Sequence, residues 1–262
     1  MRPDELRELG YKVEDGVAWI RLDRPEQLNA FSSRLYEELK WSLRFASFDE
    51  AVDVVVLTGT GRAFATGGDL KEARERIEDG DPLSFYAFVD NLPWAEFRQC
   101  PKVVIGAVNG LCHAGGVIAA VSCDITIAAE SARFALTEGR VGIADAVAPT
   151  LLASRLSTAK LKYLLLTGKE ITAREAERIG LITEVVPDDA LEARVAEVVG
   201  EVRRTSPLSR RLFKQCVNQL EPIPTDPAML FSTLGSPEAR EGLRAFSEGR
   251  APDYEGNSGQ GL

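Results

Sequence analysis

The chain has 262 residues, of which 45% are hydrophobic and 27% are charged. This composition is typical of a globular protein with a buried core and excludes disordered, collagen-like and disulfide-rich chains. There are 31 Lys and Arg against 40 Asp and Glu, which gives a net charge of −9. Because an acidic balance disfavours contact with a phosphate backbone or an anionic membrane, we expect no nucleic-acid and no membrane partner.

The cysteine pattern and the N-terminal residues indicate a cytoplasmic protein. None of the four cysteines forms a CxxC pair, which favours reduced thiols in the protein core. The first ten residues are charged and lack the apolar region of a secretory signal. Residues 103–123 carry no charge, but their glycines and polar residues divide them into strand, turn and helix rather than a membrane span.

Strands and helices are predicted to alternate along the first half of the chain. Asp15-Gly16 favours a hairpin between strands at 11–13 and 17–22. Apolar residues recur at helical spacing over 32–48, and the β-branched run 52–57 is typical of a strand covered on both faces. Further helices are expected at 70–77, about 83–97 and 115–121, and further strands at 102–108, 124–128 and 133–136. This order predicts an α/β fold.

From about Pro149 the pattern becomes mainly helical, with one strand at 182–186. A capping box at Thr172 and the Ser-Pro pairs at 206 and 236 mark helix starts. We therefore predict a core over residues 1–200 and a C-terminal helical region over residues 201–262. The apolar stripes of the second part are too few to form a core alone, so we expect them to pack against a neighbouring subunit.

Several common site motifs are absent from the sequence. Gly59-Thr-Gly61 has Phe64 where a dinucleotide fingerprint needs glycine, and Gly168-Lys169 lacks the rest of a P-loop. There is no GxSxG nucleophile elbow. Because His113 is the only histidine, a histidine-rich zinc site is excluded and no metal site is predicted.

Two glycine pairs stand where a strand gives way to a helix: Gly67-Gly68 and Gly115-Gly116. Backbone N–H groups at a helix start lack intrahelical partners and lie in the positive field of the helix dipole. If the two loops converged, they would form an oxyanion hole. The alternative is that both are only tight turns.

The sequence resembles the crotonase (enoyl-CoA hydratase/isomerase) family in two signature blocks. The first is GRAFATGGDL at 61–70, and the second combines Ala107-Val-Asn-Gly110, Gly115-Gly116 and Cys123-Asp-Ile125. Segments 24–30, 166–181 and 238–246 are similar to the family in the same order. The resemblance therefore extends over nearly the whole chain.

This resemblance implies a spiral of ββα turns whose C-terminal helices join subunits into a homotrimer or hexamer. It implies an acyl-CoA substrate, with coenzyme A present as part of that substrate and no permanently bound cofactor. The N–H groups of Gly68 and Gly115 are expected to hold the thioester oxygen, and Glu138 is expected to act as the acid/base. The residues expected to contact the substrate or its CoA are Arg24, Leu28, Ala65, Gly67, Gly68, Asp69, Leu70 and Gly115.

The sequence departs from the family at Ile118, where hydratases of the family carry the first of two glutamates. Addition of water needs one group to activate the water and one to protonate carbon, whereas a 1,3-proton shift needs a single base. The leading expectation is an enoyl-CoA hydratase. The alternatives are a Δ3,Δ2-enoyl-CoA isomerase that uses Glu138 alone and a catalytically silent CoA-thioester binding protein. Asp145 is the nearest candidate catalytic replacement, with a helix cap as its other interpretation. His113 is a second candidate, unless it is a satisfied core residue.

Overall fold

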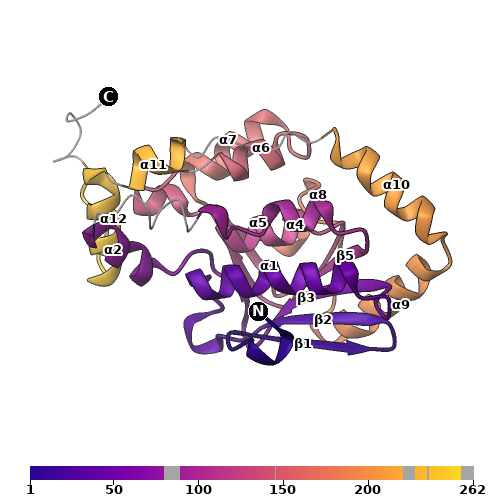
Figure 1. Cartoon of the computed structure of the whole chain (residues 1–262). Helices are drawn as coiled ribbons and strands as arrows, with labels where there is room; N and C mark the ends of the chain where they lie inside the picture. The colour runs from indigo at the N-terminus through magenta and orange to yellow at the C-terminus, as the bar shows by residue number, and fades with distance from the viewer. Residues whose placement is uncertain (80–88, 145, 221–227, 235, 255–262) are drawn as a thin grey trace.

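The computed structural model describes residues 1–79, 89–144, 146–220, 228–234 and 236–254, and it contains two β-sheets with helices packed around them (Figure 1). The larger sheet has the strand order β1-β2-β3-β5-β7-β10. Its strands are β1 (Leu9–Glu14), β2 (Val17–Leu22), β3 (Val54–Gly59), β5 (Val103–Val108), β7 (Ile125–Ala129) and β10 (Glu184–Val186). Among the described strands of this sheet, β1 and β2 pair antiparallel and the others pair parallel. The turn between β1 and β2 holds Asp15 and Gly16, both with positive φ, so the predicted hairpin is confirmed.

The smaller sheet has the order β4-β6-β8-β9. Its strands are β4 (Ala63–Ala65), β6 (Leu111–His113), β8 (Arg133–Ala135) and β9 (Ile171–Thr172). A repeated path connects the two sheets, because β3 leads to β4 and α2 (Leu70–Asp79), and β5 leads to β6 and α5 (Gly115–Ser122). The third pass runs from β7 through β8 to η3 (Glu138–Val141) and α6 (Val147–Leu152). The expected α/β spiral of ββα turns is therefore confirmed.

The larger sheet is covered on both faces, as its uninterrupted β-branched runs predict. All six residues of β3 are buried. Val55 and Leu57 of β3 belong to the core shared with α1 (Ser33–Phe48) and α5. Val54 and Val56 point to the opposite face and pack with α9 (Leu191–Arg203). The Ser32 side chain caps α1 by accepting the N–H of Leu35 at 2.9 Å.

The remaining described helices complete the outer layer: α4 (Trp94–Gln99), α7 (Thr158–Thr167), α8 (Ala173–Arg178), α10 (Pro207–Asn218), α11 (Ala228–Leu234) and α12 (Pro237–Ser247), with short turns η1 (Pro3–Glu5), η2 (Pro25–Gln27) and η4 (Asp188–Ala190). Leu234, Ala239 and Leu243 form a small cluster against Leu70 of α2, and Figure 1 shows α12 beside α2. The predicted division after residue 200 falls inside α9 and stays a prediction.

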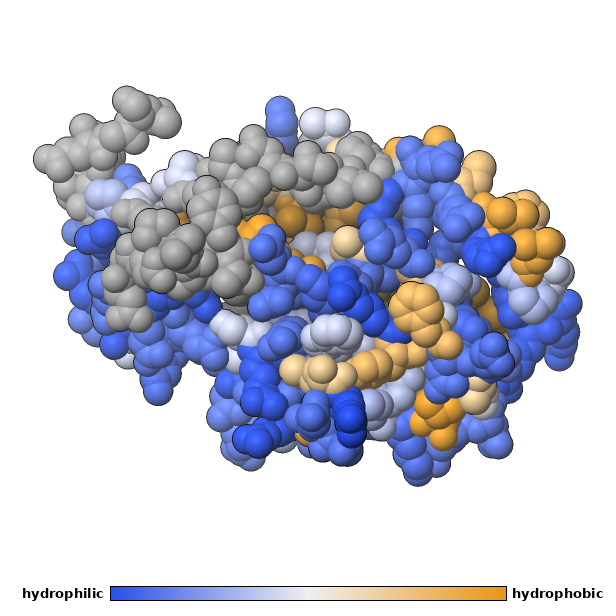
Figure 2. All heavy atoms as spheres, in the orientation of Figure 1, coloured by the Kyte–Doolittle hydropathy of each residue, from blue (hydrophilic) through white to orange (hydrophobic). Residues whose placement is uncertain are grey.

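The amphipathic helix α10 lies along the outside of the molecule, and Figure 2 shows hydrophobic atoms gathered at that end. Phe213 is 71% exposed and Leu208 is 57% exposed. Cys216 on the same helix is exposed too, whereas Cys100, Cys112 and Cys123 are buried. The prediction of a core position for Cys216 was wrong, because its apolar neighbours form a surface stripe. No helix in the described ranges is long and apolar enough to span a membrane.

Candidate active site

The two glycine loops predicted from the sequence are in contact. A Cβ built on Gly67 would lie 2.6 Å from the Ala114 Cβ and 3.3 Å from the Gly115 nitrogen. Gly67 has a φ of 91°, a conformation that residues with side chains rarely adopt. A Cβ on Gly116 would lie 2.1 Å from the carbonyl oxygen of Ala65. Close approach of the two backbones therefore requires glycine on both loops.

A short bridge to Phe31 fixes the direction of the Gly68 N–H. The Phe31 N–H donates to the Gly67 carbonyl at 2.7 Å, and the Asp69 N–H donates to the Phe31 carbonyl at 2.9 Å. In this parallel bridge the peptide groups on both sides of Gly68 face Phe31, so the Gly68 N–H points the other way. Among the described residues, neither the Gly68 nor the Gly115 N–H donates a backbone hydrogen bond. Both are available to an oxygen bound between the loops.

Gly68, Gly115 and Glu138 line one cavity of about 730 Å³. Gly115 opens α5, which is eight residues long, and Glu138 is the first residue of η3. Strand pairing brings these elements together, because β6 leads into α5 and pairs with β8, which leads into η3. Ile118 lines the same cavity and is almost completely buried. The arrangement can polarise a carbonyl and move a proton beside it.

His113 also lines this cavity, although only 22% of its side chain is exposed. Its Nε2 lies 3.2 Å from Glu170 Oε2. Burial lowers the pKa of His113 below its ordinary value, and Glu170 opposes that effect. The imidazole is therefore neutral near pH 7, with one nitrogen able to donate and the other able to accept.

Arg24 is held by ion pairs at the base of the first glycine loop. Its guanidinium lies 3.1 Å from Asp69 Oδ2 and 3.3 Å from Glu8 Oε1. It also donates to the Ala30 carbonyl at 2.5 Å. These contacts tie the end of β2 to the residue that follows Gly68, so Arg24 positions the loop.

The structure brings most, but not all, of the predicted site residues to the cavity. Those that line it are Leu28, Gly68, Asp69, Leu70, Gly115 and Glu138. Arg24, Ala65 and Gly67 are not among the lining residues, and their CoA contacts stay predictions. Asp145 lies outside the described residues. No group of potential metal ligands is close enough to hold an ion in the part of the chain that the structure describes.

Sequence reasoning missed several residues that line the cavity. Tyr36 of α1 and Trp94 of α4 form an edge-on aromatic contact at 6.0 Å between ring centroids. Lys71 and Arg76 of α2 and Arg140 of η3 bring positive charge to the wall. Tyr36 falls within the helix predicted over 32–48 but was not singled out there, and no local pattern marked Trp94 or Arg140.

Comparison with known proteins agrees with this geometry. A probable mitochondrial enoyl-CoA hydratase of Dictyostelium discoideum is 33% identical over 247 residues, which cover 91% of this chain and 87% of that protein. An enoyl-CoA hydratase structure from Mycobacterium avium subsp. paratuberculosis K-10 superposes with a TM-score of 0.82 at 26% identity, over 95% of this chain and 98% of that one.

A monofunctional enoyl-CoA isomerase from M. smegmatis is also similar. Its TM-score is 0.69 at 31% identity, and the match covers 81% of this chain and 93% of that one. Residues 12–257 match the model of the enoyl-CoA hydratase/isomerase family. The chain therefore belongs to the enoyl-CoA hydratase/isomerase family of acyl-CoA enzymes.

Proposed function

We propose that the chain is an enoyl-CoA hydratase in which Gly68 and Gly115 stabilise a thioester enolate and Glu138 moves the proton. The observation that supports this most is the meeting of two backbone N–H donors and one carboxylate in a single cavity. Hydratases are among the chains that it resembles.

In the proposed hydration, the thioester oxygen accepts hydrogen bonds from both N–H groups, which makes the β-carbon electrophilic. The Glu138 carboxylate removes a proton from water as the water oxygen bonds to the β-carbon. The negative charge passes to the thioester oxygen as an enolate. Glu138 then returns the proton to the α-carbon, and the thioester carbonyl reforms.

The water in this scheme needs a second polar group to hold it, because Ile118 offers none. The neutral ring of His113 is the candidate among the described residues of the cavity. Asp145 stays a prediction for the same role.

Isomerisation is the second candidate, and the apolar side chain of Ile118 in the cavity that Glu138 also lines favours it. Glu138 would remove the α-proton of a 3-enoyl-CoA to give a dienolate held by the same two N–H groups. It would then deliver the proton to the γ-carbon, which moves the double bond into conjugation. This path needs one base and no water.

We further propose that CoA lies along Leu28, Asp69 and Leu70, where the cations Lys71 and Arg76 of α2 face the same cavity. A phosphate or pyrophosphate group would find counter-charge there. A homotrimer or hexamer in the cytoplasm completes the proposal, since the uncovered stripe of α10 would pack on a second subunit.

The deciding experiment follows the absorbance of the conjugated thioester with two substrates. Loss of absorbance with crotonyl-CoA supports the hydratase, and gain with a 3-enoyl-CoA alone supports the isomerase. Glu138→Gln should lower kcat by about 10²–10⁴-fold in either case. The control Glu50→Gln changes an exposed glutamate that does not line the cavity and should leave kcat unchanged. Binding of acyl-CoA without turnover of either substrate would leave only the silent binding protein.

A further inference from the structure

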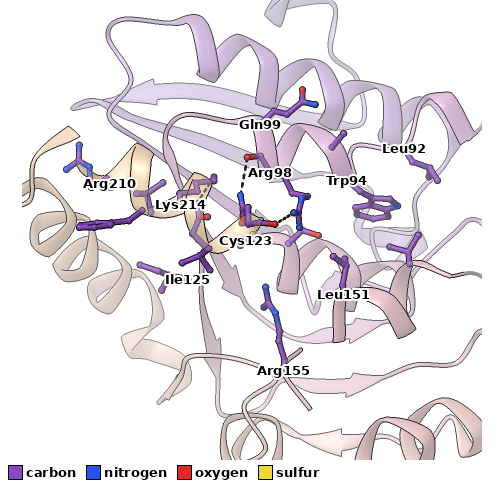
Figure 3. Close-up of a pocket in the computed structure, with 18 of the residues that line it drawn as sticks. Leu92, Trp94, Arg98, Gln99, Cys123, Ile125, Leu151, Arg155, Arg210 and Lys214 are labelled. Atoms are coloured by element: carbon purple, nitrogen blue, oxygen red, sulfur yellow. Dashed lines mark hydrogen bonds and ion pairs between the residues drawn. The ribbon is translucent and has the colours of Figure 1, made fainter. Parts of the chain in front are cut away.

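The structure has a second cavity of about 740 Å³, shown in Figure 3. It is lined by α4, the end of α5, the start of β7, α6, the end of α9 and α10. Much of its wall is apolar, with Leu92, Trp94, Ile125 and Leu151 among the lining residues. We call it the distal chamber.

The distal chamber adjoins the first cavity. Four residues line both: Leu92, Trp94, Val147 and Leu230. Helix α5 runs past the two in turn, since Gly115 and Ile118 line the first cavity and Ser122 lines the chamber. Eight helical residues span about 12 Å. An acyl chain that extended from the oxyanion donors along α5 would therefore meet these shared apolar residues before it reached the chamber.

Among the described residues that line the distal chamber, cationic side chains outnumber carboxylates. Its cations are Arg98, Arg155, Arg210 and Lys214, and its carboxylates are Asp124 and Glu201. This balance is opposite in sign to the net charge of −9 on the whole chain. Arg210 donates a hydrogen bond to the carbonyl of Thr205 at 3.0 Å, a neutral acceptor that leaves the guanidinium charge in place.

Solvent has limited access to part of the charged wall of the distal chamber. Lys214 Nζ lies 2.7 Å from Asp124 Oδ2, and the lysine side chain is only 8% exposed. The same Asp124 oxygen accepts the Val104 N–H at 2.7 Å. Burial raises the pKa of Asp124 even though Lys214 and Arg155 oppose that rise. Charges that enter such an environment interact more strongly than they would in water.

We propose that the distal chamber receives the far half of the acyl chain and that its cationic wall selects chains that end in a carboxylate. The inference rests on the proposed function, because the first cavity must hold the thioester. An extended peptide lengthens by about 3.6 Å for every three backbone bonds, or about 1.2 Å per bond. At the same rise per bond, an extended acyl chain needs about ten carbons to cover the roughly 12 Å length of α5. A carboxylate at that depth would form charge-assisted hydrogen bonds with the arginines.

The test measures calorimetric binding of saturated CoA thioesters, which cannot turn over. Sebacoyl-CoA and decanoyl-CoA both have ten-carbon chains and differ in a terminal carboxylate against a methyl. We expect sebacoyl-CoA to bind about tenfold more tightly or better, the equivalent of one charged hydrogen bond. Succinyl-CoA and butyryl-CoA end before the chamber and should show no such preference.

We call the ratio of the affinities for sebacoyl-CoA and decanoyl-CoA the ten-carbon preference. Arg155→Met should reduce this ratio to near unity. The control Arg178→Met removes an exposed cation of α8 that does not line the chamber, and it should leave the ratio unchanged. If Arg155→Met does not fold, Arg98→Met serves the same purpose. Equal binding of the ten-carbon pair by the wild-type chain would overturn the inference.

Crotonyl-CoA turnover by the same preparation separates this inference from the proposed function. Turnover of crotonyl-CoA without a ten-carbon preference overturns the proposed role of the distal chamber and leaves the proposed catalysis in place. A ten-carbon preference without turnover of any enoyl-CoA overturns the proposed catalysis and leaves the chamber as a binding site.

Discussion

At the residue scale, the neighbouring glycines of the two loops respond to different constraints. A Cβ on Gly68 would meet no atom within 4 Å, whereas one on Gly116 would lie 2.1 Å from the Ala65 carbonyl oxygen. The first position faces the cavity, and the second faces backbone that must move to admit a methyl group.

We therefore expect Gly68→Ala to leave the free energy of unfolding within about 0.5 kcal/mol of wild type. Gly116→Ala should lower it by about 3 kcal/mol or more, because forcing a methyl group into a packed site displaces the backbone. Urea denaturation of the two variants beside wild type measures both values. Equal destabilisation of the two would contradict the close approach of the loops.

His113 gives a second prediction at this scale, with its sign set by burial. Because the pKa of the folded imidazole is lowered below the ordinary value of 6.5, the unfolded chain binds its proton more readily. The free energy of unfolding should then be constant above about pH 7 and fall as the pH drops through 6.5 toward the folded pKa.

Since His113 is the only histidine, its ring protons in an NMR titration report this pKa without ambiguity. Denaturation of His113→Leu at matched pH values supplies the control, since this variant should lose the part of the acid dependence that lies near pH 6. A folded-state pKa above 6.5 would show that Glu170 outweighs burial.

At the element scale, one ion pair joins α10 to the sheet. Lys214 Nζ donates to Asp124 Oδ2 and, at 3.1 Å, to the Lys102 carbonyl. Lys214→Met would leave the partly exposed Asp124 carboxylate with only the Val104 N–H as a partner among these contacts.

Because the Asp124 side chain keeps 21% of its exposure, solvent offsets part of the lost attraction, and we expect the free energy of unfolding to fall by about 1 kcal/mol. Hydrogen exchange should accelerate in α10 first. Arg211→Met, a charge loss on the same helix outside this contact, is the matched variant. Unchanged exchange in α10 of the Lys214 variant would mean that apolar contacts alone hold the helix.

The sequence pattern predicted the long elements better than the short ones. The helix at Ser33–Phe48 and the strand at Val103–Val108 agree with expectation because their apolar spacing extends over several turns or residue pairs. The strands β4 and β6 have three residues each, too few for a period to emerge, and their glycine-rich surroundings suggested turns. The predicted helix at 83–97 lies partly outside the described residues. In the described part the prediction of one continuous helix was wrong, because residues 91–93 are not helical and α4 begins only at Trp94, after Pro93.

The candidate site was predictable where its chemistry depends on glycine and a signature block, as at Gly68 and Gly115. It was not predictable where distant segments meet. The Glu170 that faces His113 comes from the turn between α7 and β9. The residues shared by the two cavities come from α4 and the segment before it, α6 and α11. Such contacts depend on tertiary packing, for which a single sequence carries no periodic pattern.

At the scale of the whole molecule, α10 carries apolar side chains that the single chain does not cover. Leu212 is 50% exposed and Val217 is 57% exposed, on the same helix as Phe213. An exposed apolar stripe of this kind is typical of a contact surface, and the trimer or hexamer predicted from the sequence would use it.

We expect light scattering after gel filtration to give a mass of three or six times the 28.6 kDa of the chain. Leu212→Glu should shift the chain toward the monomer, because a charge buried in an apolar interface is unfavourable. Leu166→Glu, at an exposed position on α7, controls for a charge added elsewhere. A monomeric wild type would leave the stripe without a partner subunit.

The position of Trp94 between the two cavities has a spectroscopic consequence. The chain has three tryptophans, and Trp94 alone among them lines both cavities. With Trp19 and Trp41 replaced by phenylalanine, the remaining emission would report the polarity around a single indole. An acyl chain that passes it should exclude water and move the emission maximum to shorter wavelength, whereas CoA without an acyl chain should leave the maximum in place. The length of chain at which the shift first occurs would locate Trp94 along the bound substrate.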